Sequence, residues 1–162
     1  MPEELGIIES IEQAVMQISW LGQRQCMQLL DSEQFRLTLP QFYTLLYLHE
    51  AADKCKMSAV ADATHQSAAS LTGVVDRLLE KQLVMRTRDE RDRRQVVVVV
   101  TPRGSTLISA IKQARHAQMQ ATLQGLPPED TSQLLELLHR VINGMRHMLG
   151  HEEHRAWNTI KK

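Results

Sequence analysis

The stretch MSAVADATHQSAASLTGVVDRLLEKQLVMRTRDERDRRQVVVVVT, residues 57–101, decides the fold. Its first part predicts a short helix over Met57 to Ala63 and a brief turn over Thr64 to Gln66. Ser67 stands where a helix N-cap is expected, because its hydroxyl can accept a hydrogen bond from the first helical turn. The longer helix that follows has an apolar face of Leu71, Val74, Val75 and Leu78. These elements form a helix-turn-helix arrangement.

Two strands are predicted directly after this helix pair. Val84 to Arg88 is the first run, and Gln95 to Val100, which ends in five consecutive valines, is the second. β-branched residues favour strands over helices, and the charged segment Asp89 to Arg94 suits a hairpin tip. A helix-turn-helix followed by a two-stranded hairpin is a winged helix.

Long helices are expected before this region. Apolar residues at helical spacing predict a helix from Leu5 to about Leu30. A second helix, which Thr38 can cap, ends near Glu50. The stretch Ala51 to Lys56 is polar, so Cys55 is expected in a polar loop.

Two more helices are predicted after the hairpin. Thr101 and Pro102 begin a helix that runs to about Leu123, and Pro128 begins a last helix with a stripe of leucines. Because only 4% of the residues are aromatic, and glycine and proline are scarce, a mostly α protein is favoured over a sheet-rich sandwich.

The composition restricts the classes of protein to consider. With 162 residues, 43% of them hydrophobic, the chain can bury a core as one domain, or as one domain with helical extensions. Two cysteines cannot make a disulfide framework. Neither a signal peptide nor an apolar run long enough for a membrane is visible, so we expect a soluble, cytoplasmic protein with no membrane partner. Without a phosphate loop, nucleophile elbow or paired carboxylates, we expect no enzyme, cofactor or metal site.

Basic charge is concentrated locally on a chain whose formal net charge is zero. Residues 86–94 contain five arginines and three acids. Small or hydroxylated residues at a helix start let the backbone approach bases and phosphates in the major groove, and arginine at a narrow hairpin tip suits the minor groove. We therefore predict contacts with double-stranded DNA from Ser67, Ala68, Ala69, Ser70, Thr72, Arg77, Arg86, Arg91, Asp92, Arg93 and Arg94. Asp92 is included because it can hold the Arg94 guanidinium in one rotamer.

Four motifs carry a resemblance to a known family. They are Leu39-Pro-Gln-Phe, Thr72-Gly-Val-Val-Asp-Arg-Leu, Arg88-Asp-Glu-Arg-Asp-Arg-Arg and Val98-Val-Val-Thr-Pro-Arg-Gly. In this combination the chain resembles, over essentially its whole length, the multiple antibiotic resistance regulator (MarR) family of bacterial winged-helix transcription factors. The resemblance makes Arg94 the first choice for the minor groove.

The resemblance implies a particular assembly and activity. It implies a homodimer with an N-terminal dimerisation helix over residues 1–35, a DNA-binding winged helix over 36–104 and C-terminal dimerisation helices over 105–162. It also implies a repressor of a pseudo-palindromic operator, relieved by a small, often aromatic or phenolic ligand. Six amphipathic residues could line the ligand pocket: Trp20, Arg24, Met27, Tyr43, Tyr47 and His49.

Two positions depart from the family pattern. Gly73 replaces a residue that is often basic or polar, which weakens one expected phosphate contact and can loosen the recognition helix by up to about 1 kcal/mol. Gln82 replaces the usual glycine before Leu83, so the helix ends without a left-handed residue or places Gln82 in that conformation at some cost.

Three alternatives remain open. The winged helix could bind an acidic protein through Arg86 to Arg94. His147, His151 and His154, spaced by four and three residues, could bind zinc, although their spacing differs from that of a metalloprotease helix. Cys26 could sense oxidants, although a small buried hydrophobic residue is the default interpretation.

Overall fold

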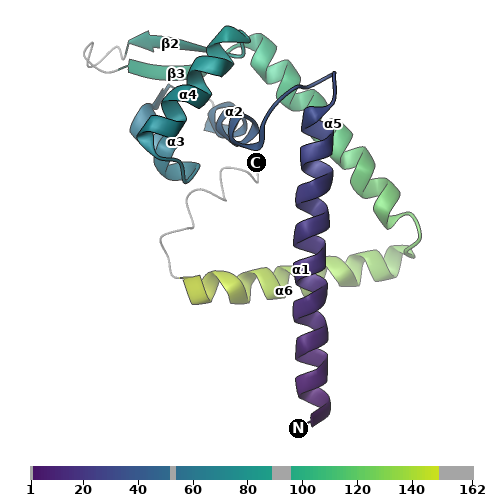
Figure 1. The fold of residues 1–162 in the computed structure, drawn as a ribbon. Coiled ribbons are helices and arrows are strands. Elements are labelled where there is room, and N and C mark those ends of the chain that lie inside the picture. Colours follow the sequence, from purple (N-terminus) through teal and green to yellow (C-terminus); the bar gives the residue numbers. More distant parts are fainter. Residues whose placement is uncertain (1, 52–53, 89–95, 150–162) are drawn as a thin grey trace. The chain divides into compact units, whose positions relative to one another are not determined.

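The computed structural model describes residues 2–51, 54–88 and 96–149. Its elements, in chain order, are α1 (Pro2–Asp31), α2 (Leu39–Ala51), β1 (Cys55–Lys56), α3 (Met57–Ala63), α4 (Ala68–Glu80), β2 (Val84–Arg88), β3 (Val96–Val100), α5 (Pro102–Leu123) and α6 (Pro128–Leu149) (Figure 1). The chain divides into two compact units, residues 1–39 and 40–162. The fold is mostly helical with one small antiparallel sheet, which confirms the fold class expected from the sequence.

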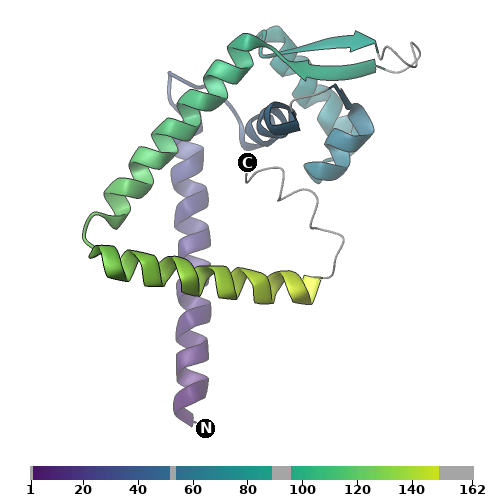
Figure 2. The same ribbon diagram turned by 180° about the vertical axis from the view of Figure 1, so that it is seen from behind.

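The core of the second unit lies between α2, α3, α4, the sheet and the first half of α5. Its fully buried side chains are Phe42, Leu45, Leu48, Val60, Leu71, Val75, Leu78, Val97, Val98, Ile108 and Ile111. Burying each of them contributes about 1.5–3 kcal/mol relative to exposure. Seen from behind in Figure 2, α3 and α4 lie beside the β2–β3 hairpin, so that these two helices and the hairpin share this core.

The sheet has the order β1-β3-β2, and both pairings are antiparallel. Val84 pairs with Val100 and Arg88 with Val96, so the hairpin predicted from the sequence is present. The expectation that Cys55 lies in a polar loop is wrong, because Cys55 is buried in β1 opposite Val98. A two-residue strand forms because its neighbour β3 offers hydrogen-bonding groups, and the side-chain pattern of residues 51–56 gives no sign of it.

Side-chain caps fix the start of α4 and of α5. The Ser67 Oγ accepts a hydrogen bond from the Ser70 backbone N–H at 3.2 Å, as the sequence predicted. The Thr101 Oγ1 accepts one from the Gly104 N–H at 3.1 Å and donates to the Gln82 carbonyl at 2.8 Å. Such caps each contribute about 1 kcal/mol. Thr101 thereby ties the start of α5 to the loop between α4 and β2.

Gln82, which follows the end of α4, takes the position where the family pattern has glycine. Gln82 adopts a left-handed conformation with a φ of 59°. The Gln82 N–H donates to the Leu79 carbonyl at 2.8 Å, and the Leu83 N–H donates to the Leu78 carbonyl at 3.0 Å. This is the Schellman pattern, usually made with glycine. The Gln82 Oε1 accepts a hydrogen bond from Arg103 at 3.3 Å, so the side chain is used as well.

Two long helices carry exposed apolar residues. On α1, Ile7, Ile11 and Ile18 are more than half exposed. None of residues 128–148 on α6 is buried, although the helix has a regular apolar stripe. Among the described residues, no helix is both long enough and apolar enough to cross a membrane.

Candidate nucleic-acid interface

The turn before α4 is held by a polar contact to α2. His65 adopts a left-handed conformation with a φ of 51°, and the chain then turns sharply into Ser67. The Gln66 Nε2 donates hydrogen bonds to the Thr44 Oγ1 at 2.9 Å and to the Thr64 Oγ1 at 3.0 Å. Because Thr44 is fully buried, the turn is attached to the core. These hydrogen bonds hold the chain in place directly before the first residue of α4.

The start of α4 presents small side chains to solvent. Leu71, Val75 and Leu78 point into the core, whereas the predicted contact residues Ser67, Ala68, Ala69, Ser70 and Thr72 are all exposed. The Thr72 hydroxyl donates to the Ala68 carbonyl at 2.8 Å. A helix with one face packed and small groups on the other allows another molecule to approach its backbone closely.

Exposed basic side chains lie on α4 and on the strand that follows it. Arg77 is exposed in the last turn of α4, and Arg88 is exposed at the end of β2. Arg86 is also exposed, and its Nη2 lies 2.7 Å from the Asp76 Oδ1. The remaining predicted contacts, Arg91, Asp92, Arg93 and Arg94, lie outside the described residues.

Asp76 is a residue that the sequence reasoning missed. It belongs to the motif Thr72-Gly-Val-Val-Asp-Arg-Leu, of which only Thr72 and Arg77 are predicted contacts from the sequence. The signal available in the sequence was its spacing. Asp76 follows Ala69, Thr72 and Gly73 at helical intervals and so shares their face.

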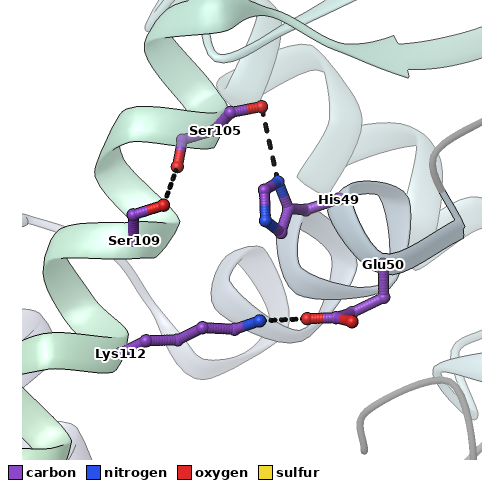
Figure 3. A network of polar contacts seen from close by, with 5 residues as sticks. All are labelled: His49, Glu50, Ser105, Ser109 and Lys112. Atoms are coloured by element: carbon purple, nitrogen blue, oxygen red, sulfur yellow. Dashed lines mark hydrogen bonds and ion pairs between the residues drawn. The ribbon is translucent and has the colours of Figure 1, made fainter. Parts of the chain in front are cut away.

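A polar network joins α2 to α5 (Figure 3). The His49 Nδ1 lies 3.4 Å from the Ser105 Oγ, and the Lys112 Nζ forms an ion pair with the Glu50 carboxylate. The Glu50 side chain is 6% exposed, and a nearly buried carboxylate needs such a partner. Arg115 adds a cation–π contact 5.8 Å from the Phe42 ring centroid. These contacts fasten α5 to α2.

The six predicted ligand residues fall into two sets, one in each unit. On α1, Trp20 and Met27 are exposed, and the Arg24 guanidinium lies 5.3 Å from the Trp20 ring centroid. On α2, Tyr43 is exposed, whereas Tyr47 and His49 are half-buried. Burial and, second, the nearby Cys55 thiol raise the pKa of the Tyr47 hydroxyl. The two tyrosines lie one helical turn apart on α2.

The candidate metal and redox residues are only partly described. His147 is exposed near the end of α6, while His151 and His154 lie outside the described residues. Within the described part of the chain, no group of three His, Cys, Asp or Glu side chains could hold a metal ion. Cys26 is 8% exposed, in agreement with its interpretation as a small buried residue.

Comparison with known proteins agrees with this geometry. The model of the MarR family matches residues 37–95. The chain is 29% identical over 100 residues to the uncharacterized HTH-type transcriptional regulator YfiV of Bacillus subtilis, a match that spans 62% of each protein. It is 29% identical over 108 residues to the HTH-type transcriptional repressor NicR of Pseudomonas putida, covering 67% of this chain and 68% of NicR.

The solved structures agree as well. A variant of MepR from Staphylococcus aureus, bound to an oligodeoxyribonucleotide, is 23% identical and has a TM-score of 0.65. The match covers 84% of this chain and 98% of that one. The resemblance carried by the sequence motifs is thus confirmed: residues 37–95 match the MarR family, and the curated relatives named here are HTH-type transcriptional regulators.

Proposed function

We propose that this protein is a sequence-specific DNA-binding transcriptional regulator. It acts in the cytoplasm as a homodimeric repressor of a pseudo-palindromic operator. The observation that carries the proposal is the start of α4, where five small or hydroxylated residues are exposed beside a two-stranded wing. The name of NicR, a transcriptional repressor, and the oligodeoxyribonucleotide bound to the MepR variant give it further support.

The winged helix of each protomer contacts two grooves of the DNA. The start of α4 enters the major groove, where Ser70 and Thr72 reach base edges and Arg77 holds a phosphate. The arginines of the wing tip, with Arg94 foremost, enter the minor groove, where the negative potential favours them. The contact residues are those predicted from the sequence: Ser67, Ala68, Ala69, Ser70, Thr72, Arg77, Arg86, Arg91, Asp92, Arg93 and Arg94.

Dimerisation uses the helices that flank the winged helix. The support is the apolar stripe on α6, where Leu134, Leu135, Leu138, Val141, Ile142 and Met145 are between 37% and 55% exposed. An exposed stripe of this length marks an interaction surface. Residues 1–35 and 105–162 form the dimer interface, and residues 36–104 bind DNA. Two recognition helices about 34 Å apart then read successive major grooves.

A small aromatic or phenolic ligand relieves repression by changing the distance between the two recognition helices. The residues proposed to bind it are Trp20, Arg24, Met27, Tyr43, Tyr47 and His49. The exposed indole with its stacked guanidinium and the two tyrosines supply aromatic faces and hydrogen-bonding groups. A ligand that fully switches the dimer must prefer one state by about 5.5 kcal/mol.

The test is selection of bound duplexes from a random pool, followed by titration of a selected duplex at several salt concentrations. We expect enrichment of a sequence with twofold symmetry. With roughly six to ten phosphate contacts, the logarithm of the association constant should fall by about 0.9 per contact for each decade of salt. A purified protein that binds no duplex at low salt, or enriches no sequence, contradicts the proposal. Salt-dependent capture of an acidic protein instead of DNA favours the protein-binding alternative.

A further inference from the structure

An acidic side chain lies on the face of α4 that is proposed to meet DNA. Ala69, Thr72, Gly73 and Asp76 recur at intervals of three, one and three residues, so they share one exposed face of the helix. The Asp76 side chain is 49% exposed. A carboxylate in this position repels the phosphates of an approaching duplex. Its presence on this face therefore requires a reason.

The ion pair between Asp76 and Arg86 supplies a reason for the acid on this face. The Asp76 Oδ1 lies 2.7 Å from the Arg86 Nη2, within the range of a strong charge-assisted hydrogen bond. Asp76 belongs to α4 and Arg86 to β2, so this bond joins the recognition helix to the wing. Pairing of Arg86 with the buried Val98 already holds the backbone at that point.

Stability alone does not explain this ion pair. Its two side chains are 49% and 38% exposed, and exposed pairs contribute at most about 1 kcal/mol to folding. Its larger effect is on the freedom of Arg86, whose long side chain otherwise has about 2 kcal/mol of rotamer entropy to lose when it binds a ligand. The Arg86 guanidinium has five N–H donors, so several remain for another acceptor after Asp76 has accepted its hydrogen bond.

We propose that Asp76 is a positioning residue, which holds Arg86 at the junction of α4 and the wing so that its remaining N–H groups meet one DNA phosphate. The inference rests on the proposed function. It predicts that the Asp76 side chain raises DNA affinity, whereas its charge alone would lower it. Removing a repelling carboxylate should strengthen binding to every duplex, whereas removing a positioning group should weaken binding to the operator.

The experiment compares the wild type with Asp76→Asn, which keeps the shape of the side chain and removes its charge. Each protein is titrated with a selected operator duplex and with a random duplex over a range of salt. We expect operator affinity to fall about tenfold per protomer, the size of one charge-assisted hydrogen bond, and affinity for the random duplex to fall as well, because a phosphate contact does not depend on the base sequence. The operator salt slope should become shallower by about one unit per lost phosphate contact.

Three further variants complete the test. Glu80→Gln removes an equal charge one turn further along α4 and leaves the Arg86 contact intact, so it should not weaken operator binding. Asp76→Glu retains a carboxylate and should restore part of the lost affinity. In the presence of Arg86→Gln, Asp76→Asn should have little further effect, because the two residues act through one contact.

Operator binding by Asp76→Asn that equals or exceeds that of the wild type overturns the inference, and so does an operator salt slope equal to that of the wild type. Either result leaves the proposed function standing, because the wild type still binds. If the wild type binds no duplex, the proposed function fails and this inference fails with it. Equal melting temperatures of the variants and the wild type exclude misfolding as the cause.

Discussion

Gly104 shows how closely the chain packs at the start of α5. A Cβ built at this glycine would lie 2.2 Å from the Leu83 carbonyl oxygen and 2.8 Å from the Val100 Cγ2. The oxygen is backbone, so it cannot rotate away as a side chain would. Gly104→Ala should lower the free energy of unfolding by about 3 kcal/mol, the upper range for overpacking. Urea unfolding measures this change.

Gly125→Ala is the matched control for that variant, because nothing lies within 4 Å of its Cβ. It should change the free energy of unfolding by less than about 1 kcal/mol. Similar midpoints for the two variants would mean that the close approach of α5 to Leu83 is not needed for stability.

Gly73 lies in the middle of α4 without a packing reason. Its Cβ would meet nothing within 4 Å, and an exposed glycine inside a helix costs about 0.5–1 kcal/mol relative to alanine. Gly73→Ala should therefore raise the free energy of unfolding by that amount. The same methyl group adds bulk to the proposed DNA-binding face, so operator affinity should fall while stability rises. Chemical denaturation and a duplex titration measure the two quantities separately.

Gly144→Ala on α6 is the control for Gly73→Ala, since its Cβ is equally unobstructed and lies on another helix. It should stabilise the protein by a similar amount and leave operator affinity unchanged. Unchanged operator affinity in Gly73→Ala would show that DNA does not approach this part of α4 closely.

At the scale of elements, the wing carries a prediction about Arg94. The strands that lead to the tip are described, with Arg88 opposite Val96 as the last pair before residues 89–95. Arg94→Ala should weaken operator binding by about 1–3 kcal/mol, because it removes the proposed minor-groove contact. The oligomeric state should not change. Titration and sedimentation together test this, and unchanged affinity would remove the wing tip from the mechanism.

Local sequence signals predicted the elements that local chemistry determines. Ser67 and Thr101 begin α4 and α5 as expected, because a hydroxyl cap acts within one turn. The valine run forms β3, since β-branched residues favour strands. β1 was missed, because Cys55 and Lys56 become a strand only through pairing with Val98 and Val97, which are distant in sequence.

In the candidate site, too, local features could be predicted from the sequence and contacts between distant elements could not. The exposed small residues of α4 followed from helical spacing and one N-cap. The contact between Asp76 and Arg86 did not, because it joins two elements whose relative placement depends on the core. The ion pair of Glu50 with Lys112 spans 62 residues and was missed for the same reason.

At the scale of the whole molecule, α6 provides the test of assembly. Leu138 and Val141 lie on its exposed apolar stripe, and no described residue of α6 from 128 to 148 is buried. The double variant Leu138→Glu/Val141→Glu should therefore cost the monomer little stability. It should abolish the dimer, because two acids per chain would be buried at the interface. Analytical ultracentrifugation measures the oligomeric state.

Asn143→Glu places an acid on the opposite side of α6 and should leave the dimer intact. If the double variant sediments as a stable dimer, the α6 stripe is not the interface. Loss of the dimer should be accompanied by weaker operator binding, because the two winged helices then bind DNA independently.

The uneven anchoring of α5 has a mechanical consequence. Gly104, Ile108 and Ile111 are buried, whereas residues 115–122 are all exposed. At about 1.5 Å per residue, the eight residues from His116 to Leu123 extend roughly 12 Å beyond the contacts that Lys112 and Arg115 make with α2. The end of α5 thus acts as a lever arm, and by the same geometry a tilt of about 10° moves its tip by roughly 2 Å. Small angular adjustments near Lys112 and Arg115 are thereby amplified into ångström-scale displacements.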